Sequence, residues 1–397
     1  MPRSLFFYAT NNFEIQVKKN VLIAIPVLLI GGTERQTLTL ASVLLSAGYK
    51  VTVCCYYESD VSMVSAMRKT GAEVLVLDLK RADGLFSLLS KLKTLWREIQ
   101  PEIVHVQYIA PGLIPVVAAK LAGIKTVFAT VHQPGRVYGW KEKTLLRIAA
   151  RLCTAFFCNS RAVEESWFGD SEIFNPGEIN RGRKHFTIYN GIDFDHIEKI
   201  GKQVDSEKLR NDLGIDNKPV IGVVGRLRWE KGQDILLDAM PEVIRVMPNT
   251  ILLVVGDGPD RMSLELRAKS LGLANNILWL GQKNPEEVYQ LYCIMDVVAI
   301  PSHFEGFGLT AAEAMAAGRP VVGSRVDGLT EVIENDVTGV LISTGDSVAL
   351  ASALTDLLSD RDKAREMGQK GRKRAGELFS IERFQKSILV AYEAFSA

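Results

Sequence analysis

The chain of 397 residues has few cysteines, and they show no pairing pattern. There are five, an odd number, and no two of them form a C-x-x-C pair. Both facts argue against a disulfide framework or a zinc site and favour a reducing compartment. We interpret these cysteines as small buried hydrophobic residues and expect no bound metal.

Charge of one sign is not in excess. Lys and Arg number 47 against 46 Asp and Glu, which gives a formal net charge of +1. No global field would therefore recruit nucleic acid, and a site for an anion must be built locally. A chain of this length and ordinary hydrophobic content is expected to form two globular domains.

Long apolar runs are also absent. The segment 21–30 follows Lys18 and Lys19, as in a signal peptide. However, it is too short to span a bilayer, and no small-residue cleavage site follows it. Gly31 and Gly32 come next, before a polar helix start. We interpret 21–30 as a buried parallel strand and expect a cytoplasmic protein.

Short apolar segments alternate with helical patterns along the chain, and after residue 346 only helical pattern remains. Strands that are apolar on both faces indicate parallel sheets with helices on both sides. The fold class is therefore α/β, with two doubly wound domains joined near residue 195 and a ligand cleft between their strand C-termini. We predict the strands at 21–30, 50–56, 73–79, 103–107, 126–132, 155–159, 187–189, 220–224, 250–255, 276–280, 297–300, 320–323 and 340–342.

Two carboxylates lie eight residues apart in the second half of the chain. Glu305 precedes the turn Gly306-Phe307-Gly308, and Glu313 lies in the helical pattern that follows. The glycines leave the start of that helix open, where free backbone N–H groups can meet an anion. One carboxylate at the turn and one along the helix can bind hydroxyls at both ends of a ligand. This pattern predicts a sugar-nucleotide site.

Two glycine-containing turns add candidates for binding a diphosphate. Arg226 and Lys231 bracket a turn directly after a strand, where they offer a planar fork and a mobile point charge. The alternative is a solvated surface turn. Gly31 and Gly32 let a backbone approach a phosphate, although tight turns also use glycine for geometry alone. The spacing G-x-G-x-x-G is absent, so a dinucleotide site is not supported.

His132 ends the strand predicted at 126–132. A histidine at the carboxyl end of a strand in a parallel sheet faces the ligand crevice, so we expect a functional role. The alternative is a packed, hydrogen-bonded histidine of the interior.

Six short elements occur in one order along the chain, and through them it resembles the retaining family-4 glycosyltransferases with the GT-B fold. The resemblance covers nearly the whole chain. The matching elements are Gly31-Gly32-Thr-Glu-Arg, Val131-His132, Ile188-Tyr-Asn-Gly-Ile-Asp193, Gly225-Arg226 to Lys231-Gly232, Gly256-Asp-Gly-Pro259, and the two glutamates with seven residues between them.

The resemblance implies two Rossmann-like domains that face a central cleft. Residues 1–195 would bind the acceptor, and residues 196–379 would bind the nucleotide sugar. The C-terminal helix, 380–397, would pack back on the first domain. One departure from the family pattern is the long segment 169–184, which is rich in glycine and charge.

The resemblance also implies how the nucleotide is held. Arg226 and Lys231 would bind the donor diphosphate, and the Gly32 backbone would approach it from the other domain. Glu313 would hold the ribose hydroxyls.

The donor sugar would meet the turn that follows the second-domain strand. Glu305 and the backbone of Gly306, Phe307 and Gly308 would hold its hydroxyls, and His132 would lie near both the sugar and the acceptor. We therefore expect His132 and Glu305 to be the catalytic residues.

The expected function is transfer of a hexosyl or N-acetylhexosaminyl group from a UDP- or GDP-linked sugar to a glycan or lipid-linked acceptor. Such a reaction belongs to the biosynthesis of polysaccharides or glycoconjugates. No DxD pair is evident at a strand end, so cations and helix N-termini would stabilise the leaving diphosphate without a metal or cofactor. The resemblance favours a same-face substitution with retention.

Two other functions remain open. A sugar-nucleotide epimerase or hydrolase could use the same nucleotide site but would need water or a further carboxylate in place of an acceptor. A non-catalytic sugar-nucleotide-binding protein is the second alternative, and the intact candidate residues argue against it.

A basic helical pattern suggests contact with a membrane surface. Lys143, Arg147 and Arg151 recur every four residues, and Tyr138 and Trp140 come just before them. A basic helix flanked by aromatic residues could lie on anionic lipid as a peripheral protein and receive a lipid-linked acceptor. The alternative is an ordinary amphipathic helix packed on the sheet.

Overall fold

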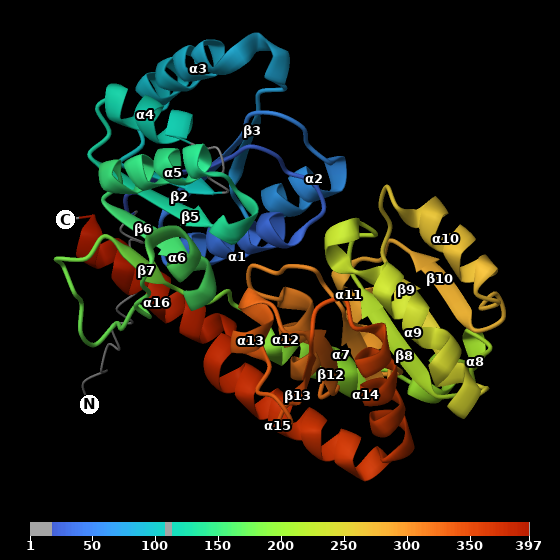
Figure 1. The fold of residues 1–397 in the computed structure, drawn as a ribbon. Helices are drawn as coiled ribbons and strands as arrows, with labels where there is room; N and C mark the ends of the chain where they lie inside the picture. Colours follow the sequence, from blue (N-terminus) through green and yellow to red (C-terminus); the bar gives the residue numbers. More distant parts are fainter. Residues whose placement is uncertain (1–17, 108–112, 397) are drawn as a thin grey trace, which may run out of the picture.

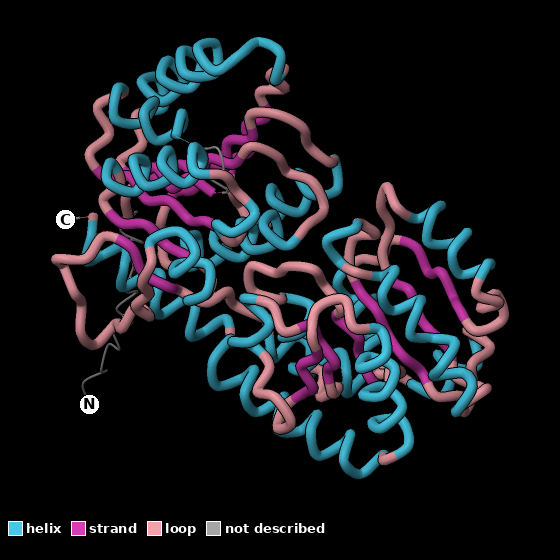
Figure 2. Tube along the Cα trace, viewed as in Figure 1, coloured by secondary structure: helices cyan, strands magenta, loops and turns pink. Residues whose placement is uncertain are grey.

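The computed structural model describes residues 18–107 and 113–396 and contains two parallel sheets (Figure 1). Helices cover both faces of each sheet (Figure 2). The prediction of two doubly wound α/β domains is therefore confirmed. The first domain was predicted to start at residue 1, and the C-terminal helix to end at residue 397. Both of these positions lie outside the described residues.

The first sheet has seven strands in the order β3-β2-β1-β4-β5-β6-β7, and all neighbours are parallel. The order reverses between β1 and β4, so their carboxyl ends flank a crevice. The strands are β1 (Asn20–Ile25), β2 (Lys50–Cys55), β3 (Glu73–Val76), β4 (Ile103–Gln107), β5 (Thr126–Val131), β6 (Ala155–Cys158) and β7 (His185–Thr187).

The connections of the first sheet are helical, as right-handed parallel crossovers require. They are α1 (Gly32–Ser46), α2 (Val61–Lys69), η1 (Arg81–Asp83), α3 (Gly84–Ile99), α4 (Leu113–Leu121), η2 (Gly135–Val137), α5 (Trp140–Leu152) and α6 (Arg161–Phe168).

The second sheet repeats this arrangement with six parallel strands in the order β10-β9-β8-β11-β12-β13. Its order reverses between β8 and β11, which gives the second domain a crevice of its own. The strands are β8 (Val220–Val224), β9 (Ile251–Val255), β10 (Ile277–Gly281), β11 (Val297–Ile300), β12 (Val321–Ser324) and β13 (Gly339–Ile342).

Helices also connect and cover the second sheet. No helix among the described residues is long and apolar enough to cross a membrane. The helices are α7 (Phe194–Gln203), α8 (Ser206–Asp212), η3 (Trp229–Lys231), α9 (Gln233–Val246), α10 (Arg261–Ser270), α11 (Pro285–Tyr292), α12 (Leu309–Ala316), α13 (Asp327–Val332), α14 (Ser347–Ser359), α15 (Arg361–Phe379) and α16 (Ile381–Phe395).

The chain passes between the domains twice, at neighbouring points. The N–H of Ile192 donates to Phe379, and the N–H of Ile381 donates to Ile192. After this point α16 runs back to the first domain (Figure 1). There Tyr392 is fully buried in the core of the first domain, and its hydroxyl lies 2.7 Å from Nδ1 of His105 on β4.

Two local differences from the sequence predictions affect the site. Strand β1 ends at Ile25 rather than at residue 30, because Pro26 has no N–H to continue the ladder. The residues after it form a loop on the ligand crevice. Helix α6 was not predicted, and the Ser160 hydroxyl caps it by accepting the N–H of Val163.

Candidate active site

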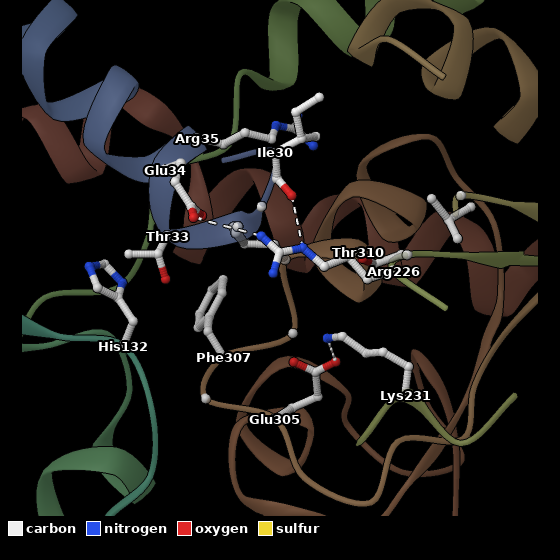
Figure 3. A pocket seen from close by; sticks show the side chains of 18 of the residues that line it. Ile30, Thr33, Glu34, Arg35, His132, Arg226, Lys231, Glu305, Phe307 and Thr310 are labelled. Atoms are coloured by element: carbon white, nitrogen blue, oxygen red, sulfur yellow. Dashed lines mark hydrogen bonds and ion pairs between the residues drawn. The ribbon is translucent and has the colours of Figure 1, made fainter. Parts of the chain in front are cut away.

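A cavity of about 390 Å³ opens between the two domains at the carboxyl ends of both sheets. Loops that follow β1, β5, β8 and β11 line it (Figure 3). Strands β1 and β8 lie where the order of each sheet reverses, so the two crevices face each other across one cavity. Its volume falls in the range of natural small-molecule sites.

All the site residues predicted from the sequence line this cavity. Two come from the first domain and the others from the second, so the cavity joins both halves of the chain. They are Gly32, His132, Arg226, Lys231, Glu305, Gly306, Phe307, Gly308 and Glu313.

Lys231 and Glu305 form an ion pair inside the cavity, with Nζ and Oε1 2.5 Å apart (Figure 3). The Ser302 hydroxyl donates to the same carboxylate oxygen at 3.1 Å. The lysine comes from the turn after β8 and the glutamate from the turn after β11, which are neighbouring strands. The pair therefore brings the cation predicted to bind phosphate next to the carboxylate predicted to bind sugar.

Arg226 reaches across the cavity to the first domain (Figure 3). Its Nε donates to the carbonyl oxygen of Ile30 at 2.8 Å, and its Nη2 lies 3.7 Å from Oε1 of Glu34. A Cβ atom on Gly31 would lie 2.2 Å from Nη2 of Arg226. A side chain on this first glycine would therefore displace the Arg226 guanidinium, whereas its extended φ of −169° is one that any residue can adopt.

The turn after Glu305 packs tightly against the first domain. A Cβ atom on Gly306 would lie 1.9 Å from the carbonyl oxygen of His132, and the Ser160 hydroxyl donates to the Gly306 carbonyl at 2.6 Å. Gly308 has a φ of +96° and starts α12. Phe307 as a whole residue is only 2% exposed, and its ring belongs to the core of the second domain.

His132 lies at the carboxyl end of β5 and is 8% exposed. Its Nε2 is 2.8 Å from Oε1 of Gln107, at the end of β4. Burial lowers the pKa of His132 to about 4, so the imidazole is neutral at pH 7. If the Gln107 oxygen accepts from Nε2–H, Nδ1 carries the lone pair and acts as an acceptor.

Glu313 is buried on α12 and forms an ion pair that the sequence analysis missed. Nη2 of Arg35, on α1 of the first domain, lies 2.9 Å from its Oε1. Burial raises the pKa of Glu313, and Arg35 opposes this rise. In the sequence, the indication of this ion pair was that Glu34 and Arg35 lie in the first helical turn, just after the two glycines and Thr33.

The cavity lining contains equal numbers of acidic and basic side chains. No group of three or more His, Cys, Asp or Glu within the described ranges is arranged to hold a metal ion. A bound diphosphate would have to recruit cations that are now paired with carboxylates. The carboxylates are Glu34, Glu230, Asp257, Glu305 and Glu313, and the cations are Arg35, Arg226, Arg228, Lys231 and Lys283.

Comparison with known proteins links this geometry to a family. The model described as Glycosyltransferase Family 4 matches residues 30–196, and that described as Glycosyl transferases group 1 matches residues 205–374. The GDP-mannose-dependent alpha-(1-6)-phosphatidylinositol monomannoside mannosyltransferase of Mycolicibacterium smegmatis is 30% identical over 301 residues, or 72% of this chain and 75% of that protein. The chain belongs to the group 1, family 4 glycosyltransferases.

Other comparisons agree with membership of this glycosyltransferase family. The D-inositol 3-phosphate glycosyltransferase of Segniliparus rotundus is 35% identical over 223 residues, which make up 53% of this chain. The match spans about half the length of that curated relative, 49%. The structure of Anabaena HepE in complex with UDP-glucose superposes with a TM-score of 0.77 at 22% identity, covering 96% of this chain and 100% of that chain. The GT-B fold is thus confirmed.

Proposed function

We propose that this protein is a retaining glycosyltransferase. It moves a hexosyl or N-acetylhexosaminyl group from a UDP- or GDP-linked sugar to a glycan or lipid-linked acceptor. One observation carries the proposal: Arg226, Lys231, Glu305 and Glu313 line a single cavity where the crevices of two parallel sheets face each other.

The cavity suits each part of such a donor. Arg226 and Lys231 would bind the diphosphate, and Glu313 would accept hydrogen bonds from the ribose hydroxyls. Glu305, next to Lys231, would meet the sugar just beyond the phosphate. The names of the relatives support both bases, because one is GDP-mannose-dependent and HepE was crystallised with UDP-glucose.

The reaction we propose needs no protein nucleophile. The bond between the sugar C1 and the diphosphate oxygen breaks, and the acceptor hydroxyl oxygen bonds to C1 on the same face. The acceptor proton passes to the departing phosphate oxygen. Arg226, Lys231 and the N–H groups at the start of α12 would stabilise the charge that develops there, without a metal ion.

Two rival functions of the same site predict different products. A hydrolase would release the free sugar from the donor without any acceptor, and an epimerase would return a new nucleotide sugar. A binding protein would leave the donor intact. Incubation with radiolabelled UDP- and GDP-sugars, with and without acceptor extracts, tests the proposal. Transfer of label only when acceptor is present supports it, and donor turnover independent of acceptor contradicts it.

Contact with an anionic membrane is also a proposal. Helix α5 buries Leu146, Ala149 and Ala150 against the sheet, as an ordinary amphipathic helix does. Yet Trp140 is 74% exposed at its start, and Ile148 is 40% exposed beside its basic residues. Flotation with anionic liposomes at low salt tests the proposal. It fails if nothing binds, or if substitution of Lys143, Arg147 and Arg151 by Ala leaves binding unchanged.

A further inference from the structure

Arg35 connects the two domains at the carboxylate proposed to bind the ribose. It extends from the first turn of α1, and its Nη2 lies 2.9 Å from Oε1 of Glu313 on α12. The same nitrogen donates to the hydroxyl of Tyr289 on α11 at 2.7 Å. One guanidinium from the first domain therefore contacts two helices of the second.

We propose that Arg35 is a positioning residue for the donor. It orients Glu313 toward the ribose hydroxyls, through a contact that the first domain makes with the second. This inference rests on the proposed function, because it takes Glu313 as the ribose ligand.

The Arg35 contact holds one end of the Glu313 carboxylate, because Nη2 of Arg35 lies 2.9 Å from Oε1. Glu313 also lines the cavity, and a carboxylate has lone pairs on both oxygens, so it can accept a hydrogen bond from a ribose hydroxyl while Arg35 stays in place. Fixing one oxygen in this way restricts the rotation of the carboxylate and prepares the other for the ligand.

The burial of Glu313 also affects its protonation. Glu313 is 5% exposed, and removal from water favours its protonated form. The groups that face it from the packed helices are Arg35, Tyr289 and Tyr292, and of these only Arg35 carries a positive charge. A protonated Glu313 would lose acceptor capacity toward the ribose, so Arg35 keeps it in the form that binds.

The preceding residue makes a reciprocal contact across the same boundary. Glu34 is 5% exposed and lies 3.7 Å from Arg226 of the second domain. Glu34 and Arg35 are consecutive residues of α1, and each faces a residue of opposite charge in the second domain. Glu34 faces Arg226, and Arg35 faces Glu313. Both partners belong to the proposed donor site, so separation of the domains would disturb the nucleotide contacts.

A blocking role for Arg35 makes the opposite prediction. In that case the guanidinium would occupy the carboxylate and leave when the ribose arrives, and its removal would strengthen nucleotide binding. The positioning role predicts weaker binding. The sign of the change distinguishes the two roles.

Calorimetric titration of the full chain with UDP and GDP provides the test. Arg35→Met should weaken binding of the preferred nucleotide diphosphate by about tenfold or more, because it leaves a buried carboxylate without its partner. With the 2′,3′-dideoxy form of that nucleotide, the same substitution should change affinity less than about twofold, because the ribose contact is already absent. Tyr289→Phe, which keeps the ion pair, should have a small effect on both ligands.

A second readout is the pH dependence of this difference. As the pH is lowered, Arg35→Met should begin to lose ribonucleotide affinity at a higher pH than wild type, because Arg35 no longer opposes the rise that burial causes in the pKa of Glu313. The dideoxy ligand corrects for titration of the diphosphate itself. If Arg35→Met does not fold, Arg35→Lys should show a smaller loss that again depends on the ribose hydroxyls.

Three outcomes would overturn the inference. Equal losses for the ribo- and dideoxynucleotides would mean that Arg35 supports the fold only. Tighter binding by Arg35→Met would assign the blocking role. If wild type binds neither UDP nor GDP, the proposed function itself fails; the first two outcomes leave that function intact.

Discussion

The Nζ atom of Lys231 lies 2.5 Å from the Oε1 atom of Glu305. In the proposed donor complex, Lys231 binds a phosphate oxygen and Glu305 binds a sugar hydroxyl. The two side chains would therefore lie close to the bond between the phosphate oxygen and C1 that breaks in the reaction. The pair must loosen when the diphosphate binds, because the lysine can then turn to a phosphate oxygen. Loosening would free the glutamate for sugar hydroxyls at the same moment.

The two diphosphate cations should matter more than surface charge. Arg226→Ala and Lys231→Ala should each lower kcat/KM by about 10- to 100-fold, since a charge-assisted hydrogen bond is worth about 1.5–3 kcal/mol. Arg245→Ala is the matched control, because Arg245 pairs with Glu242 on the exposed face of α9. Near-normal kcat/KM of both cavity variants would contradict the assignment.

Substitution of Glu313 and of Glu305 should have different effects on binding and catalysis. Glu313→Ala should mainly weaken binding of the nucleotide diphosphate product, measured by calorimetry. Glu305→Ala should leave that affinity nearly unchanged but reduce kcat, because contacts to the sugar strengthen as charge develops in the transition state. An equal loss of nucleotide affinity in both variants would mean that the sugar and ribose positions are assigned wrongly.

A methyl group on Gly306 should disturb transfer without unfolding the protein. The added Cβ would lie 1.9 Å from the His132 carbonyl, so the turn must move away from the first domain. A displacement of about 1 Å in a reacting group can cost roughly 100-fold in rate. Gly306→Ala should therefore lower kcat by about that factor in a transfer assay. Gly177→Ala, where the nearest atom is 3.4 Å away, should behave like wild type.

The buried His132 should make stability depend on pH. Its native pKa is lowered to about 4 by burial, whereas an exposed histidine of the unfolded chain has a pKa near 6.5. Between these values the unfolded chain binds the proton more readily, so the free energy of unfolding falls as the pH is lowered. Over this window, wild type should lose at most about 3 kcal/mol more than His132→Gln. Identical pH profiles in denaturant unfolding would contradict this expectation.

Glycosyl transfer should continue in the presence of a metal chelator. The proposal assigns charge stabilisation to Arg226, Lys231 and the start of α12, so removal of divalent cations should leave the initial rate within about twofold. The measurement is transfer in EDTA, compared with the same assay in magnesium or manganese. Complete loss in EDTA that either metal restores would require a metal ion in the mechanism.

Local patterns predicted much of this molecule because the physical constraint is itself local. Parallel strands are buried on both faces, which leaves apolar segments such as 220–224 and 297–300 visible in the sequence. Glu305 and Glu313 lie on one turn and the helix that follows, so their spacing already indicated that they share a site. The predicted strand 21–30 was too long because its apolar residues continue past Pro26 into a loop.

Contacts made by the docking of the domains could not be predicted in the same way. Arg35 meets Glu313 only because α1 and α12 face each other across the boundary. Helix α6 is short, and part of its capping comes from Glu331 of the second domain, which accepts the N–H of Arg161 at 3.0 Å. No pattern within a single helix specifies a partner that comes from another domain.

The return of α16 to the first domain has a consequence for how the protein is made. Ile388, Ala391 and Tyr392 of α16 complete a core that otherwise consists of buried residues from the first half of the chain, and the Tyr392 ring lies 4.8 Å from that of Phe128. During synthesis, the half that leaves the ribosome first therefore lacks a central aromatic side chain until α16 emerges. Its partner domain, complete by residue 379, can finish folding earlier, so the order of completion is the reverse of the order of translation.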